Sequence, residues 1–447
     1  MTRTITTACA ILTLALFVQP RALWAQLEWM EHPSSPVFTT GPSGSWDDGV
    51  VFDASIVQVG DTLKMWYTGN DVTVDAGLDV KIGYAWSLDG IQWVRRSEPV
   101  ISARPNGWDS HGTAGPSVIL DGDTLRMWYV TTLPTGAGKE VGYATSVDGI
   151  NWTRLESPVF EAGPEGSWDG SFLLSPRVLK EDGLFKMWYS AGRGTFPNPA
   201  IVQTGYATSS DGIHWTKYDD PQTTTGEHAL SDPVLRAGGK GSFDELRAWV
   251  PSIAATDDGY EMWYTGEAAN PVKQAVGYAT SPDGIHWTKH DENPVFESSG
   301  MWNYEIVAPL VIRDSSGYQM WFTGFTAFPN IRGGIGYAIS STNTSASPDG
   351  PTSMQSGFEL HVPYPNPVHE STTIAYDLRQ TWYVDMVIYT ILGQRIRKLV
   401  DAIQVAGSYE VEWDGVGHAG QRLAPGAYVV RAQAGGLMQS RAIFVVR

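Results

Sequence analysis

The residues most suited to chemistry in this sequence are acidic, basic and aromatic side chains that do not repeat along it. Asp53, Glu245 and Glu305 are candidate catalytic carboxylates, because a positioned pair of carboxyl groups can act as general acid and general base. The accompanying candidates for ligand binding are His111, Arg177, Arg247, Trp249 and Tyr304. For each residue alone, the alternative is a surface ion pair or a loop anchor. These residues would form one functional site if the fold brings them to a single opening.

A phrase of three parts recurs along the chain and predicts the elements that position these residues. A full copy reads Met-Trp-Tyr or Met-Trp-Phe, then Gly-Tyr-Ala, then Ser-x-Asp-Gly-x-x-Trp. The tryptophans of the first part are Trp66, Trp128, Trp188, Trp263 and Trp321. One copy is too small to bury its own apolar faces, whereas similar sheets stacked radially cover one another. The sequence therefore predicts an all-β fold, a β-propeller with five blades.

The fifth copy lacks an outer strand, and we expect the start of the mature chain to supply it. Residues 27–29 match residues 150–152, residues 36–38 match residues 158–160, and both segments end in Pro-Val-Phe. Pairing of the N-terminal segment with the strand around Tyr337 would remove the last open edge of the ring. We therefore predict that the propeller spans residues 26–341 and is closed by its N-terminal strand.

The predicted blade order brings the candidate residues to one opening of the ring. Loops that lead into the inner strands share a face with the long, irregular loops that join the second and third strands. From blade one to blade five, the first inner-strand position is occupied by Asp53, Gly115, Ser175, Val250 and Ala308. Only blade one carries an acid there, and Arg177 could lie near it across the axis. A ligand site is expected where the axial cavity opens.

A second repeated element, Trp-Asp or a variant of it, stands just before each inner strand. Its aspartate is expected to pin the loop through backbone hydrogen bonds. Asp109 and Asp169 are nevertheless included among the candidate substrate-binding residues. Acidic pairs near Gly122 and Gly259 fit tight turns and lack the length of a calcium-binding loop. We expect neither a metal nor a cofactor.

Composition and the start of the chain indicate export. Residues 1–25 combine Arg3, an apolar run and small residues near Ala25, which is typical of a secretory signal peptide and too short for a membrane span. Lysine and arginine number 30 against 48 aspartates and glutamates, giving a net charge of −18. This charge argues against nucleic acid and anionic membranes as partners. We expect a monomeric protein, secreted or attached to the outer cell surface, with no disulfide because Cys9 is its only cysteine.

Residues 342–357 are rich in serine, threonine, proline and glycine, which predicts a linker to a β domain over residues 358–447. The phrases Tyr-Pro-Asn-Pro, Ile-Leu-Gly-Gln, Trp-Asp-Gly and Pro-Gly-Ala-Tyr in this domain resemble the Ig-like C-terminal sorting domains of the bacterial type IX secretion system. They also resemble the Ig-like domain of flagellar hook-capping proteins. The resemblance implies an export and attachment label with the secretion machinery as its partner. The alternative is a plain accessory sandwich.

Taken together, the five copies resemble the five-bladed furanosidase superfamily, which includes glycoside hydrolase families 43, 32, 62 and 68. The resemblance rests on the Trp-Asp pairs, the Pro-Ser inner strands and the three-part phrase over residues 27–341. It implies a secreted glycoside hydrolase that acts on an oligo- or polysaccharide, with Asp53 as the base.

The sequence departs from that pattern at the two other catalytic positions. Gly115 and Ser175 stand where the resemblance implies an aspartate that tunes pKa values and a glutamate that acts as the acid. Glu245 or Glu305 is then the candidate acid, with His111 or Arg177 adjusting ionisation. The alternative function is a non-catalytic propeller with a degenerate active site that binds glycans or serves in surface interactions.

Overall fold

The computed structural model describes residues 29–71, 80–133, 136–195, 198–297, 302, 305–314, 317–325, 333–341, 358–379, 381–390, 394–418, 420–434 and 437–446. The expected signal peptide, the expected linker and the candidate Tyr304 lie outside these residues. The described chain is all-β, as predicted, and its regular helical structure is limited to a short 3-10 helix, η1 (Gly226–His228). Within the same residues, no helix is long and apolar enough to cross a membrane.

Each of the five sequence copies forms an antiparallel unit. Copy one contains β2 (Val50–Val59), β3 (Thr62–Asn70), β4 (Lys81–Ser87) and β5 (Trp93–Arg95). Copy two contains β6 (Thr113–Asp121), β7 (Thr124–Leu133), β8 (Gly136–Ser146), β9 (Thr153–Arg154) and β10 (Phe160–Glu161). Copy three contains β11 (Phe172–Glu181), β12 (Leu184–Thr195), β13 (Asn198–Ser209), β14 (Thr216–Lys217) and β15 (Pro233–Leu235).

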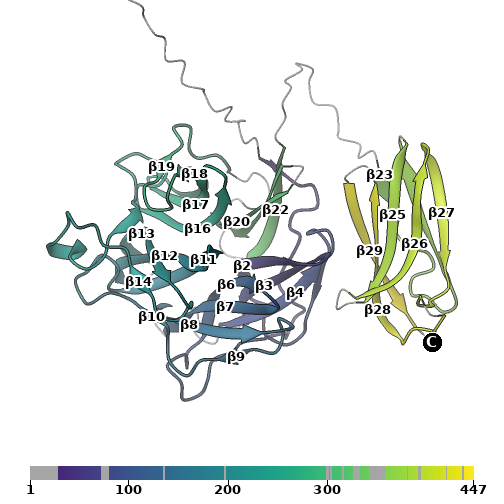
Figure 1. Ribbon diagram of the computed structural model, residues 1–447, viewed down its shortest axis with the longest axis horizontal. Coiled ribbons are helices and arrows are strands. Elements are labelled where there is room, and N and C mark those ends of the chain that lie inside the picture. The colour runs from purple at the N-terminus through teal and green to yellow at the C-terminus, as the bar shows by residue number, and fades with distance from the viewer. Residues whose placement is uncertain are drawn as a thin grey trace, which may run out of the picture.

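The last two copies complete the larger body. Copy four contains β16 (Arg247–Thr256), β17 (Gly259–Ala269), β18 (Val272–Ser281) and β19 (Thr288–Lys289). Copy five contains β20 (Glu305–Asp314), β21 (Gly317–Phe325) and β22 (Gly333–Ser341). Copies three and four are joined into one nine-stranded sheet, because Val202 of β13 pairs in parallel with Arg247 of β16. Figure 1 shows the first strands of the copies, β2, β6, β11, β16 and β20, gathered at the middle of this body.

The inner strands share a backbone irregularity at one position. Asp53, Gly115, Ser175, Val250 and Ala308 all have positive φ angles, between 42° and 56°. The strand register shifts at each of them, as in a β-bulge. In four of the five copies, the backbone amide at this position donates a hydrogen bond to a side-chain hydroxyl of the preceding copy. The Asp53 amide, for example, donates to Thr323 Oγ1 at 2.9 Å. That bond ties copy one directly to copy five.

Tryptophans of the Met-Trp-Tyr strands link each copy to the next. The Trp66 indole donates to the Gly149 carbonyl at 2.8 Å, and the Trp321 indole donates in the same way to Gly90. Both acceptors belong to Asp-Gly turns. Within the part of the chain that the structure describes, copy five shows no such turn, and the Trp263 indole nitrogen has no hydrogen-bond partner. Packing with the N-terminal segment takes the place of that bond.

The N-terminal segment pairs with copy five in the predicted place. In β1 (Met30–Glu31), Met30 lies opposite Ile339 and Glu31 opposite Ala338. The pairing continues with a 2.8 Å bond from the His32 amide to the Tyr337 carbonyl. Trp29 packs edge-on against Trp263, with ring centroids 6.5 Å apart. The outer edge of β22 is therefore covered by the start of the described chain.

Replacing Trp29 with alanine should lower the free energy of unfolding by about 2 to 3 kcal/mol, because the change empties a packed site beside Trp263. Urea unfolding followed by tryptophan fluorescence would measure the loss. Met30→Ala is the matched control, since the Met30 side chain is half exposed. Equal stability of the two variants would show that the N-terminal segment contributes little.

The C-terminal domain is a sandwich of two sheets with its own core. One sheet has β23 (Phe358–Leu360), β24 (Thr372–Leu378) and β27 (Gly407–Trp413), and the other has β25 (Trp382–Thr390), β26 (Arg395–Gln404), β28 (Gly426–Ala434) and β29 (Leu437–Val445). The buried Trp413 and Tyr376 lie in the core between them. The domain lies beside copy one (Figure 1), where Tyr389 and Arg431 both bond to Asp61 of the β2–β3 turn.

Candidate functional site

Asp53, on the first strand of copy one, lies in a hydrogen-bonded network with copy three. Its Oδ1 accepts a 2.5 Å bond from Arg177 Nη2, and its Oδ2 accepts a 2.6 Å bond from the Ser175 hydroxyl. A side chain at Gly115 would begin 3.1 Å from Asp53 Oδ2, so glycine leaves room for this contact. The expected proximity of Arg177 to Asp53 is thus present. Because both oxygens are engaged and the residue is buried, these contacts favour a structural role at the axis.

A second acidic cluster lies where copies four and five meet. Arg247, Glu267 and Gln274 stand side by side on β16, β17 and β18, because they are cross-strand partners in register. Glu267 Oε2 accepts bonds from Arg247 Nη1 at 2.9 Å and from Gln274 Nε2 at 2.6 Å. Glu267 and Gln274 are buried. The three strands therefore hold one carboxylate firmly between a cation and an amide.

Glu305, at the start of β20, interacts electrostatically with Glu267 and Arg247 of this cluster. Burial raises the pKa of its carboxyl group, and the negative charge of Glu267 raises it further, while Arg247 acts in the opposite direction. Burial likewise lowers the pKa of the Arg247 guanidinium, against the attraction of Glu267 and Glu305. The two carboxyl groups therefore interact with each other and with Arg247 in different surroundings.

A cluster of apolar side chains lies beside these polar groups. Phe172, Val202, Trp249, Val250 and Ala308 form one buried cluster. The Arg247 guanidinium lies 5.2 Å from the Trp249 ring centroid, so the candidate Trp249 links the apolar cluster to the acidic one. The structure thus brings Arg247, Trp249 and Glu305 together.

The remaining candidates lie apart from this cluster or have other contacts. Glu245 Oε2 accepts a 2.8 Å bond from the Gly241 amide, which closes a local turn, and Asp48 makes the same bond to Gly44 in copy one. His111 is exposed and contacts the neighbouring Ser110. Neither contact points to a catalytic function.

The assignment of Asp109 and Asp169 to substrate binding needs correction. Both are fully buried. Asp109 bonds to Arg104 at 2.8 Å and Arg154 at 3.2 Å, and Asp169 bonds to Lys217 at 2.6 Å. Asp47 and Asp244 have equivalent cations, Arg95 and Lys289, and each of these aspartates also bonds to the tyrosine of a Met-Trp-Tyr strand. The repeated aspartate therefore ties the loop to the outer strand through an ion pair and has no surface left for a ligand.

Replacing Lys217 with methionine should lower the free energy of unfolding by about 1.5 to 3 kcal/mol, the usual value of a hydrogen bond to a charged group. The buried Asp169 carboxylate would lose its cation. Differential scanning calorimetry would detect the change, and Lys240→Met on the exposed loop is the control. A Lys217→Met variant as stable as the control would contradict this assignment.

Sequence reasoning missed Glu267 and Gln274. Glu267 directly follows the sequence Met-Trp-Tyr-Thr-Gly within β17. The residues equivalent to Glu267 in the other copies are Asn70, Thr132, Gly192 and Phe325. The available signal was that only copy four has an acid at this position. It was missed because the position directly follows the Met-Trp-Tyr phrase, which packing alone explains.

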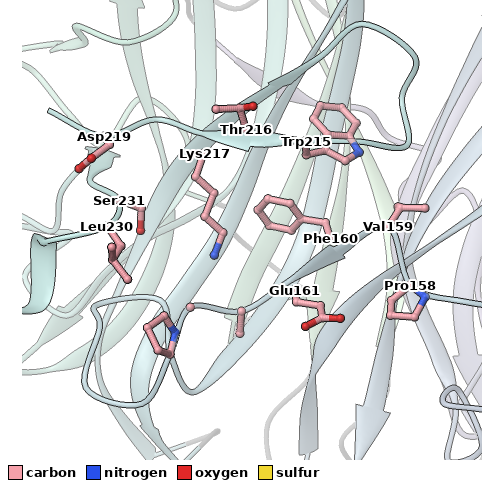
Figure 2. A pocket seen from close by; sticks show the side chains of 13 residues that line it. Pro158, Val159, Phe160, Glu161, Trp215, Thr216, Lys217, Asp219, Leu230 and Ser231 are labelled. Atoms are coloured by element: carbon pink, nitrogen blue, oxygen red, sulfur yellow. The ribbon is translucent and has the colours of Figure 1, made fainter.

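Neither of the two hollows found among the described residues is lined by a residue of the acidic cluster. One of about 720 Å³ lies between β10 and β14 at copies two and three, and Figure 2 shows Phe160, Trp215 and Lys217 on its walls. Among the described residues, no group of three or more histidine, cysteine, aspartate or glutamate side chains is placed to hold a metal ion.

Comparison with known proteins supports the division into two parts. The family model described as FlgD Ig-like domain matches residues 369–436, which confirms an Ig-like C-terminal domain. An uncharacterized protein of Mycobacterium tuberculosis is 34% identical over 192 residues, 42% of this chain and 60% of the relative. A 1,2-beta-oligomannan phosphorylase of a Thermoanaerobacter species is 31% identical over 127 residues, 27% of this chain and 42% of the relative. The chain thus spans less than two thirds of each relative.

Solved structures match the larger body more fully. A beta-1,2-mannobiose phosphorylase from Listeria innocua has a TM-score of 0.53 at 14% identity, covering 70% of this chain and 96% of that one. A structure described for glycoside hydrolases of the GH130 family that target β-1,2 mannosidic linkages in Candida mannan has a TM-score of 0.55 at 17% identity, covering 70% and 94%. These matches do not confirm the resemblance to glycoside hydrolase families 43, 32, 62 and 68. The chain shares its fold with GH130-type glycoside hydrolases and mannoside phosphorylases, and carries an Ig-like domain of the FlgD kind.

Proposed function

We propose that this chain is a carbohydrate-active enzyme that hydrolyses glycosidic bonds at the acidic cluster between copies four and five. The five units are proposed to form a five-bladed propeller, with β1 as the outer strand of the fifth blade and the cluster at one mouth of its axis. The observation that carries the proposal is the pairing of Glu305, whose pKa is raised, with the buried Glu267 held by Arg247 and Gln274. Neither acid is part of the repeated scaffold.

The proposed chemistry assigns one role to each carboxyl group. Glu305 keeps its proton at higher pH than an ordinary glutamate and donates it to the leaving glycosidic oxygen. Glu267 is proposed to be the base that activates the attacking water, with Arg247 and Gln274 fixing its orientation. Asp53 is proposed to anchor the axis through Arg177 and Ser175.

A second candidate function is glycan binding without catalysis. It is favoured by Gly115 and Ser175 at the axial positions and by the bonds that engage both oxygens of Asp53. In that case the acidic cluster would contact sugar hydroxyls without cleaving a bond.

The first substrates to test are β-1,2-linked mannosides, the sugars named for several relatives. The protein is incubated with a panel of neutral oligosaccharides that includes them, with and without inorganic phosphate. New reducing ends formed without phosphate support hydrolysis. Sugar phosphates that form only when inorganic phosphate is present would show that the reaction is phosphorolysis and not hydrolysis. Binding without products would favour the second candidate function.

The C-terminal domain is proposed to act in export and attachment of a monomeric protein to the outer cell surface. Its Ig-like fold and separate core support a domain that folds apart from the site. Fractionation of cells that express the chain with and without residues 358–447 tests this role. Equal distribution of the two forms would contradict it.

A further inference from the structure

Copy one departs from the repeated phrase at two positions beside its Asp-Gly turn. Copies two to four read Ala-Thr-Ser-x-Asp-Gly there, whereas copy one reads Ala-Trp-Ser-Leu-Asp-Gly, with Trp86 and Leu88 at the changed positions. The residues equivalent to Leu88 are exposed in the other three copies, and they are Val147, Ser210 and Pro282. Leu88 is only 4% exposed, against 81% for Val147. Because packing within each copy is the same, another part of the chain covers Trp86 and Leu88.

The C-terminal domain supplies this cover from one face of β25 and β28. Three of its apolar side chains share a buried cluster with Trp86 and Leu88, namely Val387, Tyr389 and Val429. Tyr389 lies opposite Val429 across the two strands, so the side chains form one compact patch. Alternate residues of the same strands, such as Ile388, fill the domain's own core on the other face. The sheet is therefore buried on both faces where it meets copy one.

Polar contacts hold the domain at the edge of this apolar cluster. Asp61 Oδ2, in the β2–β3 turn of copy one, accepts a 3.2 Å bond from the Tyr389 hydroxyl and lies 3.4 Å from Arg431 Nη2. The Asp61 carbonyl accepts a further bond from Arg431 Nη1 at 3.0 Å. The Arg431 guanidinium also lies 5.2 Å from the Tyr389 ring centroid. These contacts converge on one turn and define one orientation of the domain.

The aspartate of the copy-one Asp-Gly turn differs electrostatically from its equivalents. Burial raises the pKa of Asp89, against the hydrogen bonds of the turn and the positive charge of Arg441 in β29. In copies two to four, the bonds of the same turn outweigh burial, and the pKa of each equivalent aspartate is lowered; these residues are Asp148, Asp211 and Asp283. The turn of copy one is therefore enclosed where the others face solvent.

We propose that copy one is the docking site of the C-terminal domain of the same chain, and that the larger body and this domain form one rigid unit in solution. Domains joined by a linker move relative to each other unless an apolar contact holds them. The patch at Trp86, Leu88 and Asp61 provides that contact. The dock does not depend on the proposed reaction. A domain that attaches the chain to a surface would, through this dock, also fix the direction in which the larger body faces.

The test measures the exposure of the docked side chains in the full chain by hydroxyl-radical footprinting with mass spectrometry. Leu88→Asp places a charge in the apolar contact. The matched control is Val147→Asp, because Val147 occupies the same position of the turn in copy two and is exposed. Trp128 and Trp413, each buried in the core of its own domain, report whether both domains remain folded.

In the wild-type protein, Trp86 and Tyr389 should be as protected as Trp413. Leu88→Asp should raise the labelling of both about tenfold, a change of about 1.4 kcal/mol in the docking equilibrium, because a buried charge without a partner is unfavourable. Val147→Asp should leave them at wild-type values. Wild-type labelling of Tyr389 as fast as that of Tyr364, which is 80% exposed, would overturn the dock. Unchanged protection in Leu88→Asp would also overturn it.

A charge exchange keeps the test decisive if Leu88→Asp exposes Trp128 or Trp413. Arg431→Glu should raise the labelling of Trp86, because it places two negative charges together at Asp61. Adding Asp61→Arg restores opposite charges and should recover part of the protection; no recovery would overturn the assigned contact. Light scattering that shows a dimer of wild-type chains, converted to monomers by Arg431→Glu, would place the dock between two chains and overturn the proposal.

Discussion

Glu305→Gln is expected to reduce kcat on a cleavable glycan by about 10²- to 10⁴-fold, the usual contribution of a positioned general acid. Glutamine keeps the size and hydrogen-bonding shape of the side chain but cannot donate the proton. Substrate affinity should change little, because the amide still contacts the same sugar. Reducing-end assays under saturating substrate measure the effect. The matched control is Glu245→Gln, which alters a carboxylate engaged in a local turn with Gly241.

The pH dependence of the wild-type protein follows from the same residue. Glu305 must be protonated to act as the acid, so activity should be present at low pH and fall as pH rises through its raised pKa. The folded state holds this proton more tightly than the unfolded state, so the stabilisation is full below the ordinary glutamate pKa and is lost as pH rises through the raised value. Glu305→Gln should therefore be at least as stable as wild type at pH 8. A less stable variant, or an unchanged basic limb in its residual activity, would contradict the assignment.

Asp53→Asn is expected to lower the free energy of unfolding by about 3 to 5 kcal/mol, because it leaves the Arg177 guanidinium buried without its counterion. Arg177 is only 7% exposed on its side chain. The double variant with Arg177→Met removes the uncompensated charge and should recover part of the loss. Chemical unfolding of both variants measures the coupling, and Asp258→Asn in an exposed turn is the control.

The same variant separates a structural from a catalytic Asp53. An Asp53→Asn protein as stable as wild type but without turnover would reverse our assignment and make Asp53 the base. An Asp53→Asn protein that is less stable than wild type, but whose folded fraction retains turnover, would support the structural role of Asp53.

Much of the fold was predictable because the same sequence pattern recurs five times, and each copy must bury its apolar faces in the same way. The Met-Trp-Tyr strands, the Asp-Gly turns and the pairing of the N-terminal segment near Tyr337 all follow from local patterns. The positive φ of Asp53, Ser175, Val250 and Ala308 did not, since these residue types disfavour that conformation. Hydroxyl groups of the preceding copy, such as that of Thr323, accept bonds from the amides of Asp53, Val250 and Ala308, and a single strand does not reveal such neighbours.

The candidate site was predicted in part. Glu305, Arg247 and Trp249 were selected because they do not repeat, and they do lie together. Asp109 was misassigned because its cation, Arg154, comes from an outer strand 45 residues away in the chain. Glu267 was missed because cross-strand register with Arg247, rather than sequence proximity, places it in the cluster.

The most direct test of the account is a crystal structure of Glu305→Gln soaked with an oligosaccharide that the wild-type protein binds. We predict a glycosidic oxygen within hydrogen-bond distance of the residue-305 side chain, with Glu267 beside the reacting sugar. A sugar bound at Asp53 without contact to residue 305 or Glu267, or bound only elsewhere on the surface, would contradict the proposed site.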